Sequence, residues 1–394
     1  MKKENTTEVT SRRNIFALGF VSFFTDVSSE MVFSILPAFL LSLPGGSRAV
    51  LGLVEGTAEA LSYTLRAISG VFSDKIRKRK LLVLVGYSIS NVAKPFFALA
   101  KAPLEVLIIR VSDRVGKAVR TSPRDVLLSE SASERHRGAA FGLHRTLDQA
   151  GAIIGPIAAS LLMITLGFTM QEVFWFSLIP GTVALLLLVF FVKEKTSKLQ
   201  GDFKLLAGVR SVLKGKFAWL LVIVGFFSLG AFNFSFVLLN AQQAGIANSF
   251  IPLVYAVVNL AHTVTAIPAG VLSDRVGKEK VMLLGFSLFL CSAFLILVLP
   301  VNGFNALVVA TVYGVYFGIV ETTQRALIPE YVDANLKGTA YGIYYFVVGL
   351  AFFASNAIVG SLWEYFGSTI AAAYSAIVSL LAVIMLTVFV RRNK

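Results

Sequence analysis

Two stretches of this chain, 200 residues apart, nearly repeat each other. Residues 70–80 read GVFSDKIRKRK and residues 270–280 read GVLSDRVGKEK, and each stretch follows one long apolar segment and precedes another. A loop rich in lysine and arginine between apolar segments is typical of the cytoplasmic side of a membrane protein. The repeat therefore predicts two related halves whose basic loops lie on the same side of a membrane.

The composition supports a polytopic membrane protein. Of the 394 residues, 56% are hydrophobic and only 15% are charged, whereas a soluble domain carries about 25% charged residues. The formal net charge is +14, but the basic residues form short clusters between apolar runs. They do not form a stripe interleaved with aromatic residues, so we expect no nucleic-acid partner.

The sequence contains no pattern typical of a metal site, a cofactor site or an enzyme. The single cysteine, Cys291, excludes an intrachain disulfide, and the three histidines lack metal-ligand spacing. No P-loop motif for ATP is present. The polar N-terminus is followed by no small-residue cleavage site, so we expect the first apolar segment to be a retained helix.

Apolar runs long enough to cross a bilayer are frequent, since a core of about 30 Å needs roughly 20 helical residues. Eleven such runs lie near 14–42, 49–72, 81–100, 139–165, 171–192, 217–240, 250–272, 280–300, 305–328, 339–362 and 369–390.

A twelfth spanning helix is predicted at 104–130, although this stretch is polar. Without it, the two basic loops would lie on opposite sides of the membrane. The repeat agrees, because GAAFG at 138–142 matches GTAYG at 338–342 with the same offset. The predicted fold is all-α, with twelve transmembrane helices in two six-helix bundles and both termini in the cytoplasm.

The predicted domains are a first bundle at 1–192, a cytoplasmic linker at 193–214 and a second bundle at 215–394. The linker is the most polar interior stretch. A short amphipathic helix at 203–213 is expected to lie on the membrane surface.

At this level the whole chain resembles the major facilitator superfamily. That family carries Gly-x-x-x-Asp-Arg-x-Gly-Arg/Lys after helices 2 and 8. The matching residues are Gly270, Asp274, Arg275, Gly277 and Lys278 in the second copy, and Gly70 and Asp74 in the first, where Arg77 replaces the second glycine. The resemblance implies gating loops, in which the aspartates join a charge network that latches one conformation. Alternatively, the basic residues only set the topology.

A second resemblance concerns helix 5, where export-type members carry Gly-x8-Gly-x3-Gly-Pro-x2-Gly-Gly. Here Gly142, Gly151, Gly155 and Pro156 fall at those spacings, whereas Ala159 and Ser160 replace the last two glycines. Close helix packing at these positions would seal the cavity during exchange, so the match favours efflux. Ordinary small-residue packing is the alternative.

Ionizable residues inside the predicted helices define a candidate site, because charges at the bilayer centre cost at least about 2.5–3.5 kcal/mol and rarely face lipid. The helical rise places Asp26, Arg114 and Asp148 near the midplane. In this superfamily, their helices border the central cavity. The predicted proton-coupling residues are Asp26, Glu30, Asp113 and Asp148. Their predicted charge partners are Glu59, Arg66, Arg110, Arg114, Arg120, His144 and Arg145. Two alternatives to a proton-coupling role remain. These residues form a fixed salt-bridge core, or they bind a charged substrate directly.

The second half carries aromatic residues where the first half carries ions. Across the repeat, Asp113, His144 and Arg145 correspond to Tyr313, Tyr344 and Tyr345. One account is that the first half couples to protons and the second contacts the substrate. Residues expected to join this surface from helix 7 are Phe232, Asn233, Phe236 and Asn240. Core packing of these aromatic residues is the alternative.

Together these features predict a monomeric, proton-coupled secondary transporter of the inner or plasma membrane. Efflux of a small organic molecule by rocking of two bundles is favoured. Uptake or exchange of a small anionic metabolite, attracted by the arginines, is the second candidate. A non-transporting receptor or assembly factor on the same fold is a third.

Overall fold

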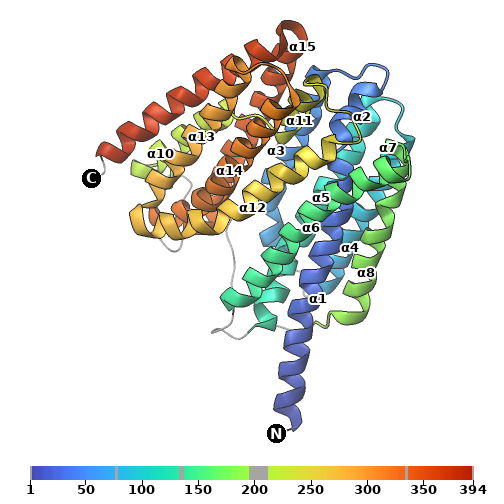
Figure 1. Cartoon of the computed structure of the whole chain (residues 1–394). Helices are drawn as coiled ribbons and strands as arrows, with labels where there is room; N and C mark the ends of the chain where they lie inside the picture. The colour runs from blue at the N-terminus through green and yellow to red at the C-terminus, as the bar shows by residue number, and fades with distance from the viewer. Residues whose placement is uncertain (1, 76–78, 133–136, 195–211, 333–335, 393–394) are drawn as a thin grey trace. The chain divides into compact units, whose positions relative to one another are not determined.

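The structure is a computed structural model that describes residues 2–75, 79–132, 137–194, 212–332 and 336–392 (Figure 1). All regular elements in these ranges are helices. The first half contains α1 (Lys2–Phe33), α2 (Leu36–Ser42), α3 (Arg48–Lys75), α4 (Arg79–Ala93), η1 (Lys94–Leu99), α5 (Pro103–Ser131), α6 (Arg137–Thr165), α7 (Met170–Phe176) and α8 (Leu178–Phe191). The second half contains α10 (Gly215–Gly230), α11 (Phe234–Gln243), α12 (Ile251–Val276), α13 (Lys278–Val298), α14 (Gly303–Leu327), η3 (Ile328–Glu330) and α15 (Lys337–Arg392).

Nine helical stretches in the described part of the chain are long and apolar enough to cross a membrane. The all-α membrane fold is thereby confirmed. α5 covers the polar stretch in which the repeat predicted a helix, and its 29 residues correspond to about 43 Å of helix. α15 contains two helices joined at Gly367, whose φ of 88° lies in the region that favours glycine. The count of twelve crossings stays a prediction.

The helices group into two compact units. Unit 1 comprises Met1–Leu36 and Leu65–Phe203, and unit 2 comprises Pro37–Thr64 and Lys204–Lys394. The α2 helix and the first half of α3 therefore belong to unit 2, although the sequence places them in the first predicted bundle. Most of the predicted linker lies outside the described residues.

Within each unit, glycines allow neighbouring helices to approach closely. In unit 1, α1 packs along α6 and α8, and α4 packs along α5. In unit 2, α12 packs along α14, and α15 packs along α10 and α13. A Cβ atom on Gly318 of α14 would lie 2.5 Å from the carbonyl oxygen of His262 on α12.

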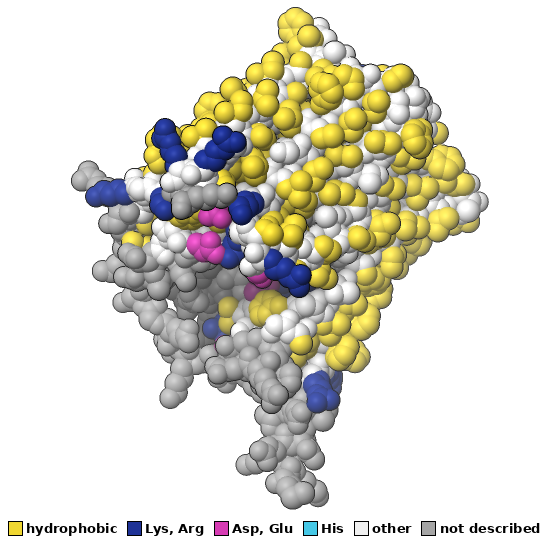
Figure 2. Space-filling view, turned by 60° about the vertical axis from the view of Figure 1, so that its left-hand side comes forward, with side chains coloured by type: hydrophobic (Ala, Val, Ile, Leu, Met, Phe, Trp, Pro, Cys, Tyr) yellow, Lys and Arg dark blue, Asp and Glu magenta, His cyan; other side chains and the backbone are white. Residues whose placement is uncertain are grey.

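Hydrophobic side chains cover most of the face seen in Figure 2, and lysine and arginine side chains gather toward one end of it. Large apolar residues are strongly exposed, such as Ile267 at 76% and Phe304 at 75%. Contiguous exposed apolar surface of this kind is stable against lipid and not against water.

Candidate functional site

In unit 1, two carboxyl groups from different helices meet. Asp26 on α1 and Asp148 on α6 lie within hydrogen-bonding reach of each other. Ser22, one turn before Asp26, donates a hydrogen bond from Oγ to Asp148 Oδ1 at 2.5 Å, and Arg145 Nη1 donates to Oδ2 at 3.0 Å. Since one proton can join two carboxyl oxygens, this arrangement can hold and exchange a proton.

Glycines on α6 allow α1 and α6 to approach closely enough for Asp26 and Asp148 to interact. A Cβ atom on Gly151 would lie 2.3 Å from the carbonyl oxygen of Phe23, and one on Gly155 would lie 2.7 Å from that of Val27. The backbones of α1 and α6 are therefore in direct contact beside Asp148. Gly142, by contrast, has no heavy atom within 4 Å of an added Cβ. Pro156 lies inside α6 without interrupting it.

A second ionic group lies on α5. Arg110 has no exposed surface, and its Nη1 lies 4.0 Å from Asp113 Oδ2. The guanidinium carbons of Arg110 and Arg114 lie 3.8 and 5.4 Å from the centre of the Phe33 ring. A carboxylate and an aromatic face thus replace water around two buried cations.

Serines bind the remaining buried cations of this unit. Lys94, at the start of η1, donates from Nζ to the hydroxyls of Ser28 and Ser29 on α1 at 2.6 and 3.2 Å. Arg120 donates from Nη1 to Ser90 Oγ at 2.6 Å. No charge pattern in the sequence points to these hydroxyls.

The other predicted charged residues occupy varied positions. Glu30 is half-buried, one turn after Asp26 on α1, and His144 is buried on α6. Glu59 lies in the part of α3 that belongs to unit 2. The side chain of Arg66 lies outside the described residues. The structure thus joins Asp26 with Asp148, and it places Asp113 among arginines.

In unit 2, the chain between α10 and α11 is not helical, and two side chains form hydrogen bonds with its backbone groups. The Tyr313 hydroxyl on α14 donates to the Phe232 carbonyl oxygen at 2.9 Å, and Asn356 Oδ1 on α15 accepts from the Asn233 N–H at 2.9 Å. Asn233 Oδ1 in turn accepts from the Ser235 N–H and caps α11. Broken helices at membrane depth leave backbone groups that must be satisfied in this way, and they are frequent at transporter sites.

We expect Tyr313→Phe to lower stability by about 1–3 kcal/mol, because it leaves the buried Phe232 carbonyl without its donor. The measurement is thermal unfolding of the purified protein in detergent. Tyr316→Phe is the matched control. Both tyrosines are 3% exposed, but it is the Tyr313 hydroxyl that donates to the backbone between α10 and α11. Equal losses in the two variants would contradict a specific role for the Tyr313 hydroxyl.

The predicted aromatic residues pack into contacts within unit 2. Phe232 stacks on Tyr313 with ring centres 5.8 Å apart, and Tyr345 stacks on Tyr63 at the same spacing. The Phe236 ring lies against Trp363 at 5.6 Å. The Tyr344 hydroxyl donates to Gln324 Oε1 at 2.6 Å.

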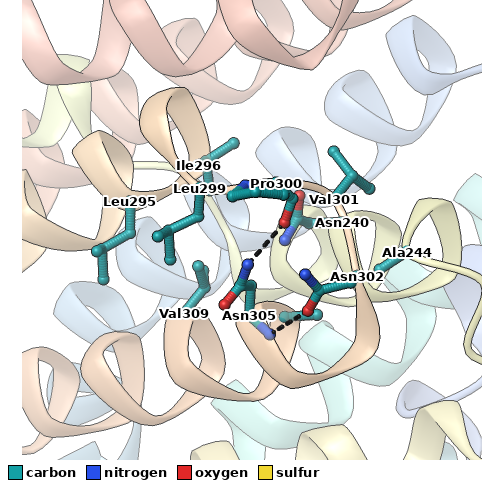
Figure 3. Close-up of a pocket in the computed structure, with 11 residues that line it drawn as sticks. Asn240, Ala244, Leu295, Ile296, Leu299, Pro300, Val301, Asn302, Asn305 and Val309 are labelled. Atoms are coloured by element: carbon teal, nitrogen blue, oxygen red, sulfur yellow. Dashed lines mark hydrogen bonds between the residues drawn. The ribbon is translucent and has the colours of Figure 1, made fainter.

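Asn240 lies instead in a small pocket formed by α11, the end of α13 and the start of α14 (Figure 3). There Asn305 Nδ2 donates to the Pro300 carbonyl oxygen at 2.8 Å, and Asn302 Oδ1 accepts from the Asn305 N–H at 2.9 Å. These bonds cap the start of α14 and fix the preceding turn.

The two basic loops end in similar ion pairs. Arg79 at the start of α4 pairs with Glu130 at the end of α5, and Lys278 at the start of α13 pairs with Glu330 in η3. Glu130 and Glu330 stand 200 residues apart, so the alignment of the repeat would have found them. The Glu279 carboxylate accepts from the Tyr331 hydroxyl. Burial and this hydrogen bond raise the pKa of Tyr331.

The predicted loop residues are only partly described. Gly277 joins α12 to α13 with a φ of 102°, which favours glycine. Asp274 and Arg275 are exposed, and Gly270 lies in the last turns of α12. Arg77 lies outside the described residues, as do the surroundings of Gly70 and Asp74.

One ionizable pair of unit 2 escaped the sequence analysis. His262 Nε2 on α12 lies 3.0 Å from Glu321 Oε2 on α14, and the His262 ring lies 4.8 Å from that of Phe317. The sequence signal that could have indicated this pair is Glu321, an acidic residue within the apolar run 305–328. Its partner is 59 positions away in the sequence, so only the packing of α12 on α14 brings the pair together.

Solved transporter structures share this fold. The chain matches the nucleoside transporter NupG with a TM-score of 0.76 at 15% identity, covering 96% of this chain and 99% of that one. It matches the human organic anion transporter MFSD10 with a TM-score of 0.64 at 15% identity, covering 95% and 99%. The fold is therefore that of a membrane transporter.

The family model described as Major Facilitator Superfamily matches residues 18–355 and 218–394. An uncharacterized MFS-type transporter of Methanocaldococcus jannaschii is 32% identical over 374 residues, which cover 92% of each chain. The multidrug resistance protein MdtG of Proteus mirabilis is 27% identical over 296 residues, covering 71% of this chain and 72% of that protein. The chain belongs to the major facilitator superfamily, and it is a multi-pass membrane transporter rather than an enzyme.

Proposed function

We propose that the protein exports a small organic molecule in exchange for protons. The observation that carries this proposal is the carboxyl pair of Asp26 and Asp148, with Ser22 and Arg145 as its polar neighbours. Proton-coupled transport requires a group whose proton affinity changes as the transporter changes conformation. A carboxyl pair that shares one proton between two helices can be such a group, because a movement of either helix changes the affinity of the pair for the proton.

Two observations favour efflux. The similarity to MdtG, named a multidrug resistance protein, covers about 70% of the chain. In addition, Gly151 and Gly155 of the export-type pattern bring α6 into direct contact with α1. We infer a location in the plasma or inner membrane with both termini in the cytoplasm, and function as a monomer. The basic ends of the helices support this orientation.

The test is transport by the purified protein in liposomes with an imposed pH gradient. We expect substrate to move against its own gradient when protons flow the opposite way, and substrate addition to cause proton movement of matching sign. A panel of neutral, cationic and anionic compounds identifies the cargo. Flux that ignores the pH gradient for every transported compound would refute proton coupling.

A second candidate is exchange or uptake of an anionic metabolite, favoured by the buried guanidinium groups of Arg110 and Arg114 on α5. Under this alternative, the arginines bind the substrate. Arg114→Gln would then raise the concentration for half-maximal anion transport and leave the transport of cations unchanged.

A further inference from the structure

The interior of unit 2 is acidic. Glu55 and Glu59 lie one turn apart on the first half of α3, and Glu321 lies on α14. The spanning segments 49–64, 217–273, 281–324 and 338–390 contain no lysine or arginine. By contrast, the helices of unit 1 carry Lys94, Arg110, Arg114, Lys117 and Arg120.

A group of tyrosine rings begins one turn from Glu59. Tyr63 follows it by one turn of α3, and the ring of Tyr63 stacks on Tyr345 at 5.8 Å. Tyr345 also contacts Tyr341 and Tyr344, with ring centres at 6.1 and 5.6 Å.

The α14 helix contributes two further rings. Tyr313 is close enough to Glu59 and Tyr63 for an electrostatic interaction, and Tyr316 is close enough to Tyr63. The rings of Tyr313 and Tyr316 are in contact, with centres 5.2 Å apart. We call Glu59, Tyr63, Tyr313, Tyr316 and Tyr345 the Glu59 cluster.

Part of the Glu59 cluster is accessible. Glu59, Tyr63 and Tyr345 are only half-buried, whereas Tyr313 and Tyr316 are buried. A carboxylate at membrane depth faces protein or a water-filled cavity and not lipid, because lipid exposure of a charge is too costly. The exposed parts of Glu59 and of the two half-buried rings are therefore expected to face water rather than lipid.

We propose that the Glu59 cluster binds the positively charged group of an organic cation, so that cationic amphiphiles are the substrate class. This proposal rests on the transport function proposed above. The carboxylate neutralises the ligand charge, and the tyrosine faces attract it by cation–π interaction. An anion would be repelled by the Glu59 carboxylate. A metal ion is disfavoured, because nowhere in the described part of the chain do three metal-binding side chains come together.

The test uses two ions of nearly equal size and shape but opposite charge, tetraphenylphosphonium and tetraphenylborate. Binding of each to the purified full chain is measured by equilibrium dialysis at one detergent concentration and without any gradient. We expect the protein to bind the phosphonium at least about tenfold more tightly than the borate. Glu59→Gln should weaken phosphonium binding at least about tenfold and should not weaken borate binding.

Two further variants separate the aromatic contribution from folding defects. Tyr63→Phe keeps the ring face and should bind within about twofold of the original protein, whereas Tyr63→Ala should lose binding. Glu105→Gln removes a carboxylate from the exposed start of α5 and should change nothing. Thermal midpoints of all variants show which of them are folded.

Equal binding of the two ions, or unchanged phosphonium binding in folded Glu59→Gln protein, would overturn the cation site. Because dialysis needs no gradient, its outcome is independent of proton coupling. If phosphonium binding is intact but transport does not respond to the pH gradient, only the proton-exchange mechanism is refuted. Proton-coupled transport without phosphonium binding refutes the cation site alone.

Discussion

Asp148→Asn is expected to reduce flux driven by a pH gradient at least about tenfold. Asparagine has the size of aspartate and can still accept a hydrogen bond from Ser22, which lies 2.5 Å from Asp148, but it does not bind or release protons. Exchange of labelled for unlabelled substrate without a gradient should persist, because it needs no net proton movement. Proteoliposomes with equal amounts of protein provide both measurements.

The partner carboxyl group gives a sharper form of the same test. Asp26→Asn should reduce driven flux as much as Asp148→Asn, and the double variant should be no worse than either one, because residues that act as a unit are not additive. Glu105→Gln is the control and should leave driven flux unchanged, since Glu105 lies at the exposed start of α5. Undiminished driven flux in Asp26→Asn and Asp148→Asn would remove the pair from the coupling mechanism.

The repeat in the sequence was a strong guide to the fold. Hydropathy alone missed the polar helix α5, whereas alignment at an offset of 200 predicted it, because two related halves must thread the membrane in the same way. Helical rise also placed Asp26 and Asp148 at similar depth. Depth does not determine which side chains touch, and their contact depends on the approach of α6 to α1 at Gly151.

Other features depend on tertiary packing that no local pattern encodes. Glu59 was grouped with the ions of the first half because of its place in the chain, yet residues 37–64 pack within unit 2. The break before α11 is stabilised by Tyr313 and Asn356, which lie 81 and 123 residues from their backbone partners. Binding surfaces built from several helices are therefore the part of a transporter that sequence patterns predict least.

Gly151→Ala is expected to lower both stability and driven flux substantially. The added Cβ atom would lie 2.3 Å from the carbonyl oxygen of Phe23, and backbone cannot rotate away as a flexible side chain can. The helices α1 and α6 must separate, which costs about 1–3 kcal/mol. Separation also moves Asp148 away from Ser22 and Asp26, so driven flux should fall together with the thermal midpoint.

Gly142→Ala is the matched control, because it makes the same chemical change in the same helix and the same glycine pattern. Its Cβ atom meets no heavy atom within 4 Å, and alanine favours a helix over glycine by up to about 1 kcal/mol. We therefore expect an unchanged or raised midpoint and normal driven flux. If Gly142→Ala were as damaging as Gly151→Ala, the glycines would act through backbone flexibility. Close contact between α1 and α6 would then not be what positions the carboxyl pair.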